Sequence, residues 1–143
     1  MSAPASLLYS SKLAGKKVLV FECTSGIGLS VATIALAEST HVYISSSNQT
    51  KLDAAAKNLE TNLHAILTTA TKNGPLDHVV FTAGNALTPA HVTAPTATSI
   101  HTASIVRFVA PAIAYKLLAS KQSFFTPSPV SSITFTSGKN SAN

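Results

Sequence analysis

Short apolar runs alternate along this chain with longer stretches in which apolar residues recur at helical spacing. The apolar runs, which predict strands, are 18–21, 41–45, 77–83 and 132–136. The stretches of helical spacing, which predict helices, are about 26–38, 49–72 and 100–119. Because the first run is apolar without interruption, it indicates a strand that is buried on both faces of a parallel sheet. The alternation of strands and helices predicts an α/β fold.

The first helix is expected to pack against the sheet through one apolar face. Ile27, Val31, Ile34 and Ala35 share that face, because they are spaced three or four residues apart. The second helix keeps its helical phase for about six turns. The sequence Asn-Gly-Pro at 73–75 then ends it. This unbroken phase leaves no room for a further strand inside the helix.

The third helix contains Pro111, which we expect to kink it at a cost of about 3 kcal/mol. Its apolar positions are Ile105, Phe108, Val109, Ala112, Ile113 and Leu117. The Ser- and Pro-rich stretch 120–130 is predicted to be a linker to the last strand. Residues 1–15 are predicted to be a leader, of which 12–15 turn into the first strand.

Right-handed crossovers determine the expected order of the strands. Numbered along the chain, the strands should lie in the order 2-1-3-4. The helices at 49–72 and 100–119 should cover one face and the helix at 26–38 the other. We therefore expect residues 1–143 to form one domain, a three-layer, doubly wound parallel sheet of about four strands. Because a single helix covers the second face, that face stays partly exposed. The exposed apolar area favours self-association or poor solubility.

Composition narrows the classes of function. The net charge is +5, yet only 10% of the residues are charged and the basic ones are mostly scattered. A nucleic-acid groove needs a denser basic stripe with aromatic residues, so we expect no nucleic-acid partner. No apolar run reaches the ~20 residues of a membrane span. The lack of a secretory pattern and the single cysteine, Cys23, favour a cytoplasmic protein. We expect Cys23 to be buried, and no residue cluster has metal-ligand spacing.

The turn between the first strand and the first helix is the strongest candidate for a binding site. It consists of Thr24, Ser25, Gly26, Ile27 and Gly28. Such a turn presents free N–H groups and the positive end of a helix dipole, which suit the diphosphate of a dinucleotide. A complete fingerprint has a third glycine four residues before Gly26, where this chain has Glu22. The bulk and negative charge of Glu22 predict a weakened affinity for the cofactor.

Ser46, Ser47 and Asn48 follow the second strand, about twenty residues after the glycines. An acidic residue at this place would bind the 2′-hydroxyl of NAD, and none occurs between Glu38 and Asp53. Hydroxyl and amide groups could hold a 2′-phosphate instead, which favours NADP(H) over NAD(H). The alternative is that these residues cap the next helix, as serine and asparagine often do.

Several segments together resemble one family. TSGIG after the first strand, ISSSNQTKLD at 44–53, LDHVVFTAG at 76–84 and SSITFTSG at 131–138 are similar to the short-chain dehydrogenase/reductase family, and most of all to its fungal members. The resemblance covers about residues 12–139. It implies a Rossmann fold, an NAD(P)(H) cofactor and hydride transfer between the nicotinamide and a carbonyl or alcohol carbon.

The resemblance also implies roles for individual residues. Ala83 and Gly84 match a motif that lines the adenosine side of the cofactor, with Thr82 in place of its asparagine. Arg107 stands where the family usually has a catalytic asparagine. Ser137 aligns with the catalytic serine, whose hydroxyl steadies the substrate oxygen.

The chain departs from the family pattern in two places. The segment with the family's third strand is missing between Leu59 and Leu63, and no Tyr-x-x-x-Lys follows Ser137, after which six residues remain. The tyrosine is the family's proton donor, so we expect that this chain does not catalyse hydride transfer at the rates of the family. His78 and His101 are the candidate replacements for this acid, but a lone histidine is more often a surface or core residue without a catalytic role. One alternative is a non-catalytic protein, which binds a nucleotide, a second copy of itself or a full-length relative. The other alternative is a repurposed isomerase that uses Ser137.

Overall fold

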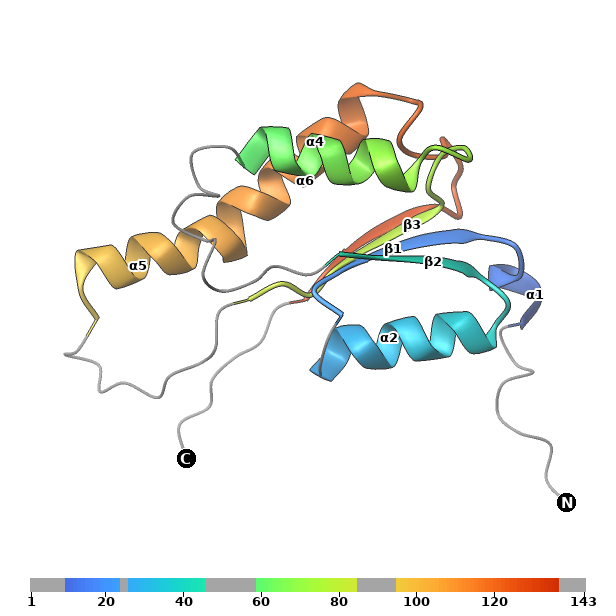
Figure 1. Ribbon diagram of the computed structural model, residues 1–143, viewed down its shortest axis with the longest axis horizontal. Helices are drawn as coiled ribbons and strands as arrows, with labels where there is room; N and C mark the ends of the chain where they lie inside the picture. The colour runs from blue at the N-terminus through green and yellow to red at the C-terminus, as the bar shows by residue number, and fades with distance from the viewer. Residues whose placement is uncertain (1–9, 24–25, 46–58, 85–94, 137–143) are drawn as a thin grey trace, which may run out of the picture.

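The computed structural model describes residues 10–23, 26–45, 59–84 and 95–136. They form a parallel sheet between two layers of helices (Figure 1). The elements are α1 (Ser10–Leu13), β1 (Lys17–Phe21), α2 (Gly26–Ala37), β2 (His41–Ser45), α4 (Leu59–Ala70), β3 (His78–Phe81), α5 (Ala97–Ser104), the π-helical turn η4 (Ile105–Val109), α6 (Ala110–Ser120) and β4 (Ser132–Phe135). The four strands lie in the order β2-β1-β3-β4, which confirms the predicted α/β fold and its 2-1-3-4 topology.

The central strand β1 is buried on both faces, as its apolar run predicts. Leu19 is in the larger core cluster with α4 and α6, and Val20 is in a smaller cluster with α2. In Figure 1, α4 and α6 lie above the sheet and α2 lies below it. The predicted assignment of helices to faces is therefore confirmed for the described part of each helix. Residues 46–58, which include the start of the predicted helix at 49–72, lie outside the described residues.

The larger core joins α4 and α6 to the sheet. Its buried members are Leu19, Phe21, Leu63, Leu67, Ala70, Leu76, Val79, Phe81, Ala110, Ala114, Leu117, Leu118 and Phe124. Leu67 and Leu76 have no exposed surface, so they are at its centre. The continuous helix α4 passes through Leu63 with its apolar phase intact, as predicted.

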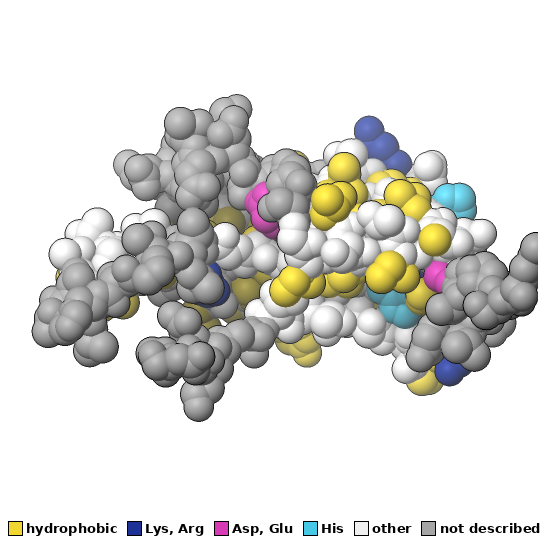
Figure 2. Space-filling model, turned by 90° about the horizontal axis from the view of Figure 1, so that it is seen from below, with side chains coloured by type: hydrophobic (Ala, Val, Ile, Leu, Met, Phe, Trp, Pro, Cys, Tyr) yellow, Lys and Arg dark blue, Asp and Glu magenta, His cyan; other side chains and the backbone are white. Residues whose placement is uncertain are grey.

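The buried face of α2 differs from the predicted one. Ile27 and Ile34 are 64% and 63% exposed, whereas the helix is buried through Gly28, Ala32 and Ala35. The reason is that α2 lies so close to the sheet that only small residues fit between them. The larger apolar side chains point outwards, and hydrophobic groups are visible on this side of the molecule (Figure 2).

The helix around Pro111 contains a π-helical turn that the sequence did not predict. Pro111 is the second residue of α6 and lies inside the continuous helix Ala97–Ser120. The π-helical turn η4 precedes it, and the N–H of Ala110 bonds the carbonyl of Ile105. A π turn inserts an extra residue and changes the helical phase. Phe108, one of the apolar positions of the predicted helix, is 74% exposed.

The segment Ala97–Ser120 is one apolar helix of 24 residues with a mean hydropathy of 1.3. By length and composition alone it is long and apolar enough to cross a membrane. Its second half nevertheless belongs to the core, because Ala110, Ala114, Leu117 and Leu118 are buried beside the sheet. The first half, Ala97–Val109, has no buried residue, so only the second half is part of the core.

Two segments are more ordered than predicted. The predicted leader contains the short helix α1, and the predicted linker 120–130 packs along the sheet. Phe124 is buried in the core. The N–H of Leu76 bonds the carbonyl of Phe124, and the N–H of Thr126 bonds the carbonyl of Leu76. The linker therefore extends the hydrogen bonding ahead of β3 and β4.

We expect Ser39→Gly to stabilise the fold. Ser39 follows α2 with a φ of 59°, the left-handed conformation that favours glycine. The N–H groups of Ser39 and Thr40 bond the carbonyls of Leu36 and Ala35, so this conformation ends the helix. Chemical denaturation should show a gain in unfolding free energy of about 0.5–1 kcal/mol. Ser39→Ala retains the Cβ and should show no gain.

Candidate functional site

The parallel strands end together at one edge of the sheet, and the predicted site residues follow these ends (Figure 1). Within the described residues, Gly26, Ile27 and Gly28 begin α2 after β1, and Ala83 and Gly84 follow β3. The structure therefore places these predicted residues at one edge. Six predicted residues lie outside the described ranges: Thr24, Ser25, Ser46, Ser47, Asn48 and Ser137.

Gly28 sets the distance between α2 and the end of β1. A Cβ at this position would overlap the carbonyl oxygen of Glu22 and lie 2.6 Å from Thr82 Oγ1 and 3.0 Å from Cys23 Cα. Two of these three neighbours are backbone atoms, which cannot move aside as a flexible side chain could. Gly28 therefore acts through close packing of helix on strand, and this packing positions the helix N-terminus beside the sheet.

Glu22 and Gly26, which lie on either side of residues 24–25, both have a positive φ. The N–H of Glu22 bonds the carbonyl of Ser45 at 2.6 Å, so β1 still pairs with β2 there. The backbone then turns through a φ of 61° at Glu22, which is a left-handed conformation suited to glycine. Gly26 also has a positive φ of 58°, and a Cβ there would meet nothing within 4 Å. Among the described residues, nothing therefore crowds the Cβ position of Gly26.

Thr82 joins the ends of β1 and β3. Its hydroxyl lies 2.7 Å from the carbonyl oxygens of both Phe21 and Glu22, to which it can donate its proton. Its N–H bonds the carbonyl of Phe21 as well. This contact, together with the tight fit of Gly28, holds the backbone of Glu22 beside both β3 and α2. Cys23, within the same turn, is 4% exposed, which confirms the prediction that it is buried.

Arg107 is a site residue that the sequence pattern did not single out for binding. It lies in η4, and its guanidinium approaches Gly84, since a Cβ on Gly84 would be 3.3 Å from Nη2. The structure thus brings a cation to the end of β3. The available signal was that Arg107 is the only arginine in the chain.

Of the two histidine candidates, His78 lies away from this edge. His78 begins β3, at the opposite end of the strand, where its Nδ1 is 3.0 Å from Ser132 Oγ. Burial lowers the pKa of His78, and the nearby Lys16 lowers it further, while the Asp77 carboxylate raises it. His101 is exposed on α5. Within the described ranges no three His, Cys, Asp or Glu residues lie close enough to hold a metal ion.

The described edge can bind an anion. A helix N-terminus carries partial positive charge, and α2 begins at this edge with Gly26. Arg107 adds a full positive charge beside Gly84. Glu22, which follows β1 at this edge, has a carboxylate side chain. The residues present therefore fit a diphosphate group, with one unfavourable charge.

Comparison with known proteins gives consistent results. A family model described as the SDR-like Rossmann domain, for short-chain dehydrogenases/reductases, matches residues 57–143. The short-chain dehydrogenase/reductase fsr5 of Gibberella fujikuroi is 38% identical over 73% of this chain and 49% of its own length. The corresponding protein malC of Malbranchea aurantiaca is 31% identical over 88% of this chain and 56% of its own. The chain thus spans about half the length of these relatives.

Solved structures show the same likeness. The structure of the MalC reductase/Diels-Alderase of Malbranchea aurantiaca has a TM-score of 0.74 and 31% identity, covering 90% of this chain and 59% of that one. A small-chain dehydrogenase in complex with NADPH has a TM-score of 0.62 and 29% identity, covering 87% of this chain and 51% of that one.

Proposed function

Because the chain belongs to the short-chain dehydrogenase/reductase family, we propose that it binds a nicotinamide dinucleotide at the carboxyl edge of its sheet. The observation that carries this proposal is the contact of Gly28 with the backbone of Glu22 and Cys23. It holds the start of α2, at Gly26, against β1. The NADPH complex of a relative at 29% identity supports the choice of ligand.

Different residues of this edge would contact different parts of the dinucleotide. The amides around Gly26 would hold the diphosphate, and Ala83 and Gly84 would line the adenosine side. Arg107, whose guanidinium lies against Gly84, would attract the phosphates electrostatically. We further propose NADP(H) over NAD(H), on the hydroxyl and amide groups of Ser46, Ser47 and Asn48 after β2.

Catalysis by these 143 residues is proposed to be absent or very slow. The bound cofactor would supply or accept a hydride, and Ser137 would steady the substrate oxygen. A general acid near neutral pH contributes about 10²–10⁴-fold to such a reaction. The sequence has no Tyr-x-x-x-Lys to provide it, since Tyr115 and Lys116 are adjacent. Nucleotide binding without turnover is therefore the activity we expect.

Titration with NADPH tests both parts of the proposal. We expect quenching or transfer of cofactor fluorescence and a rise in the melting temperature, with weaker effects from NADH. Incubation with simple ketones should show no loss of NADPH absorbance above the rate of a protein-free control. Absence of binding at millimolar NADPH would contradict the binding proposal, and clear turnover would contradict the proposed lack of catalysis.

A further inference from the structure

Among the described strands, β2 is at one edge of the sheet, and its own sequence lacks the residues that usually protect such an edge. Among the described strands it pairs with β1 alone, and its sequence His-Val-Tyr-Ile-Ser contains no lysine, acidic residue or proline. Proteins commonly protect such edges with charges, prolines or bulges, because an open edge pairs readily with another strand. Ile44, in this strand, is 65% exposed.

The backbone of β2 is oriented for a further partner. The N–H of His41 bonds the carbonyl of Lys16, and the carbonyl of Ser45 accepts from Glu22, so these two residues direct their polar groups towards β1. Because successive residues of a strand alternate, Val42 and Ile44 direct theirs to the outer side. These are the groups that a neighbouring strand would bond.

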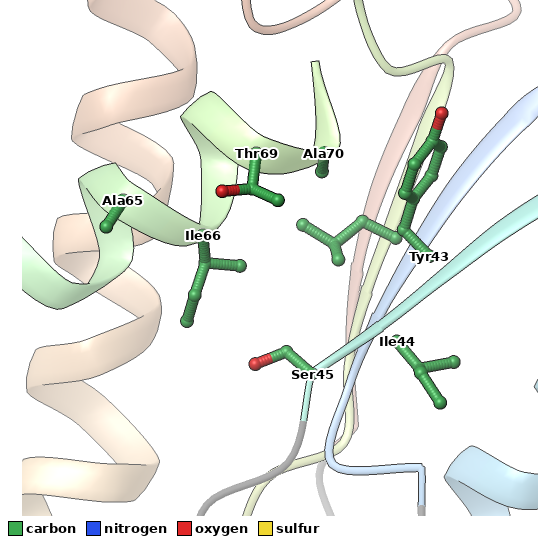
Figure 3. A pocket seen from close by; sticks show the side chains of 8 residues that line it. Tyr43, Ile44, Ser45, Ala65, Ile66, Thr69 and Ala70 are labelled. Carbon is green, nitrogen blue, oxygen red and sulfur yellow. The ribbon is translucent and has the colours of Figure 1, made fainter. Parts of the chain in front are cut away.

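A groove runs beside this edge, between β2 and α4 (Figure 3). Its volume is about 320 Å³, and its lining is mostly apolar. Tyr43 from β2 and Ile66 and Thr69 from α4 are among the lining residues. Tyr43 belongs to the α4 side of the sheet and Val42 to the α2 side. A strand added to β2 would therefore place alternate side chains in the groove and against the α2 side.

We propose that the partner is a second copy of this chain, whose β2 pairs antiparallel with the first about Tyr43. The polarity of the strand is symmetric about this residue, with apolar neighbours on both sides and polar residues beyond them. Antiparallel pairing centred there places Val42 opposite Ile44 of the second copy, and His41 opposite Ser45. The outward groups of Val42 and Ile44 then bond reciprocally, no charged pair is buried, and a two-fold interface results.

The match of the strand to itself is what favours a second copy over an unrelated extended peptide. Tyr43 of each copy forms a non-hydrogen-bonded pair, the closer kind, on the α4 side. There it adds apolar surface to both grooves, while Ile44 loses its exposure on the other side. The contact is short, so we expect a dissociation constant on the order of 10 µM.

Sedimentation velocity from about 1 to 500 µM tests the dimer directly. We expect a concentration-dependent dimer in the wild type and at least tenfold weaker association in Ile44→Lys, which places a charge at the edge. Val130→Lys is the matched control, because Val130 is 66% exposed and lies ahead of β4, away from this edge. It should associate like the wild type. Circular dichroism should confirm that both variants are folded.

Cross-linking tests the proposed register. In a Cys23→Ala background, Tyr43→Cys should form a covalent dimer on mild oxidation, because Cα atoms of a non-hydrogen-bonded pair lie about 4.5 Å apart, within disulfide reach. His41→Cys should not, since its symmetric copy would be about 13 Å away. A wild type that stays monomeric at every concentration, an unaffected Ile44→Lys, or cross-linking through His41 instead would overturn the proposal.

Discussion

Gly28→Ala is expected to lower the free energy of unfolding by about 3 kcal/mol or more. The new methyl group would overlap the carbonyl oxygen of Glu22 and press on Thr82 Oγ1 and Cys23 Cα, 2.6 and 3.0 Å away. Relief requires α2 to move away from β1, which separates the helix N-terminus from the sheet. Urea denaturation followed by circular dichroism measures the loss. A chain of this size has only about 5–15 kcal/mol of stability, so this loss would be a large fraction of the total.

Gly15→Ala is the matched control for this effect. Gly15 has a φ of 73°, but a Cβ there would meet nothing within 4 Å. The same substitution therefore tests the left-handed conformation without the clash, and should cost about 1 kcal/mol. If Gly28→Ala cost no more than Gly15→Ala, the close contact of α2 with β1 would be wrong.

Glu22→Gly is expected to tighten NADPH binding about tenfold or more. The substitution removes a carboxylate from the proposed diphosphate site, where two unit charges about 4 Å apart repel by roughly 1 kcal/mol in water and 4 kcal/mol at an effective dielectric of 20. Glycine also adopts the φ of 61° at this position without strain. Fluorescence titration at fixed ionic strength measures the dissociation constant.

Two further variants separate charge from backbone conformation. Glu22→Gln removes the charge but retains the Cβ, and we expect it to recover most of the gain in affinity. Ser39→Gly relieves a similar φ of 59° at the far end of α2, and should leave the affinity unchanged. An affinity that stays flat in Glu22→Gly would show that the diphosphate does not bind at this turn.

The topology could be predicted because it depends on local patterns. The apolar run of β1 indicates a central strand, and the lengths and handedness of the connections then determine the neighbours of that strand. The described residues of the candidate site lie at one edge because the ends of parallel strands converge there. Gly26 and Gly28 could be recognised because their spacing and context are local features of the sequence.

The buried face of α2 and the contacts of the site could not be predicted in this way. Helical periodicity favoured Ile27 and Ile34, but the approach of Gly28 to β1 turns the small residues inwards. The π turn η4 likewise exposes Phe108. These outcomes depend on how closely two elements pack, and hydrophobic spacing within one element carries no information about that distance.

The sequence by itself determined the class of fold, the order of the strands and the family to which the chain is similar. Only the tertiary structure decided that Glu22 adopts a left-handed backbone, that Thr82 joins the ends of two strands, and that Arg107 lies beside Gly84. The physical reason is that strands, turns and crossovers arise from neighbouring residues and chain handedness. Contacts between residues far apart in sequence depend on the packing of the complete domain.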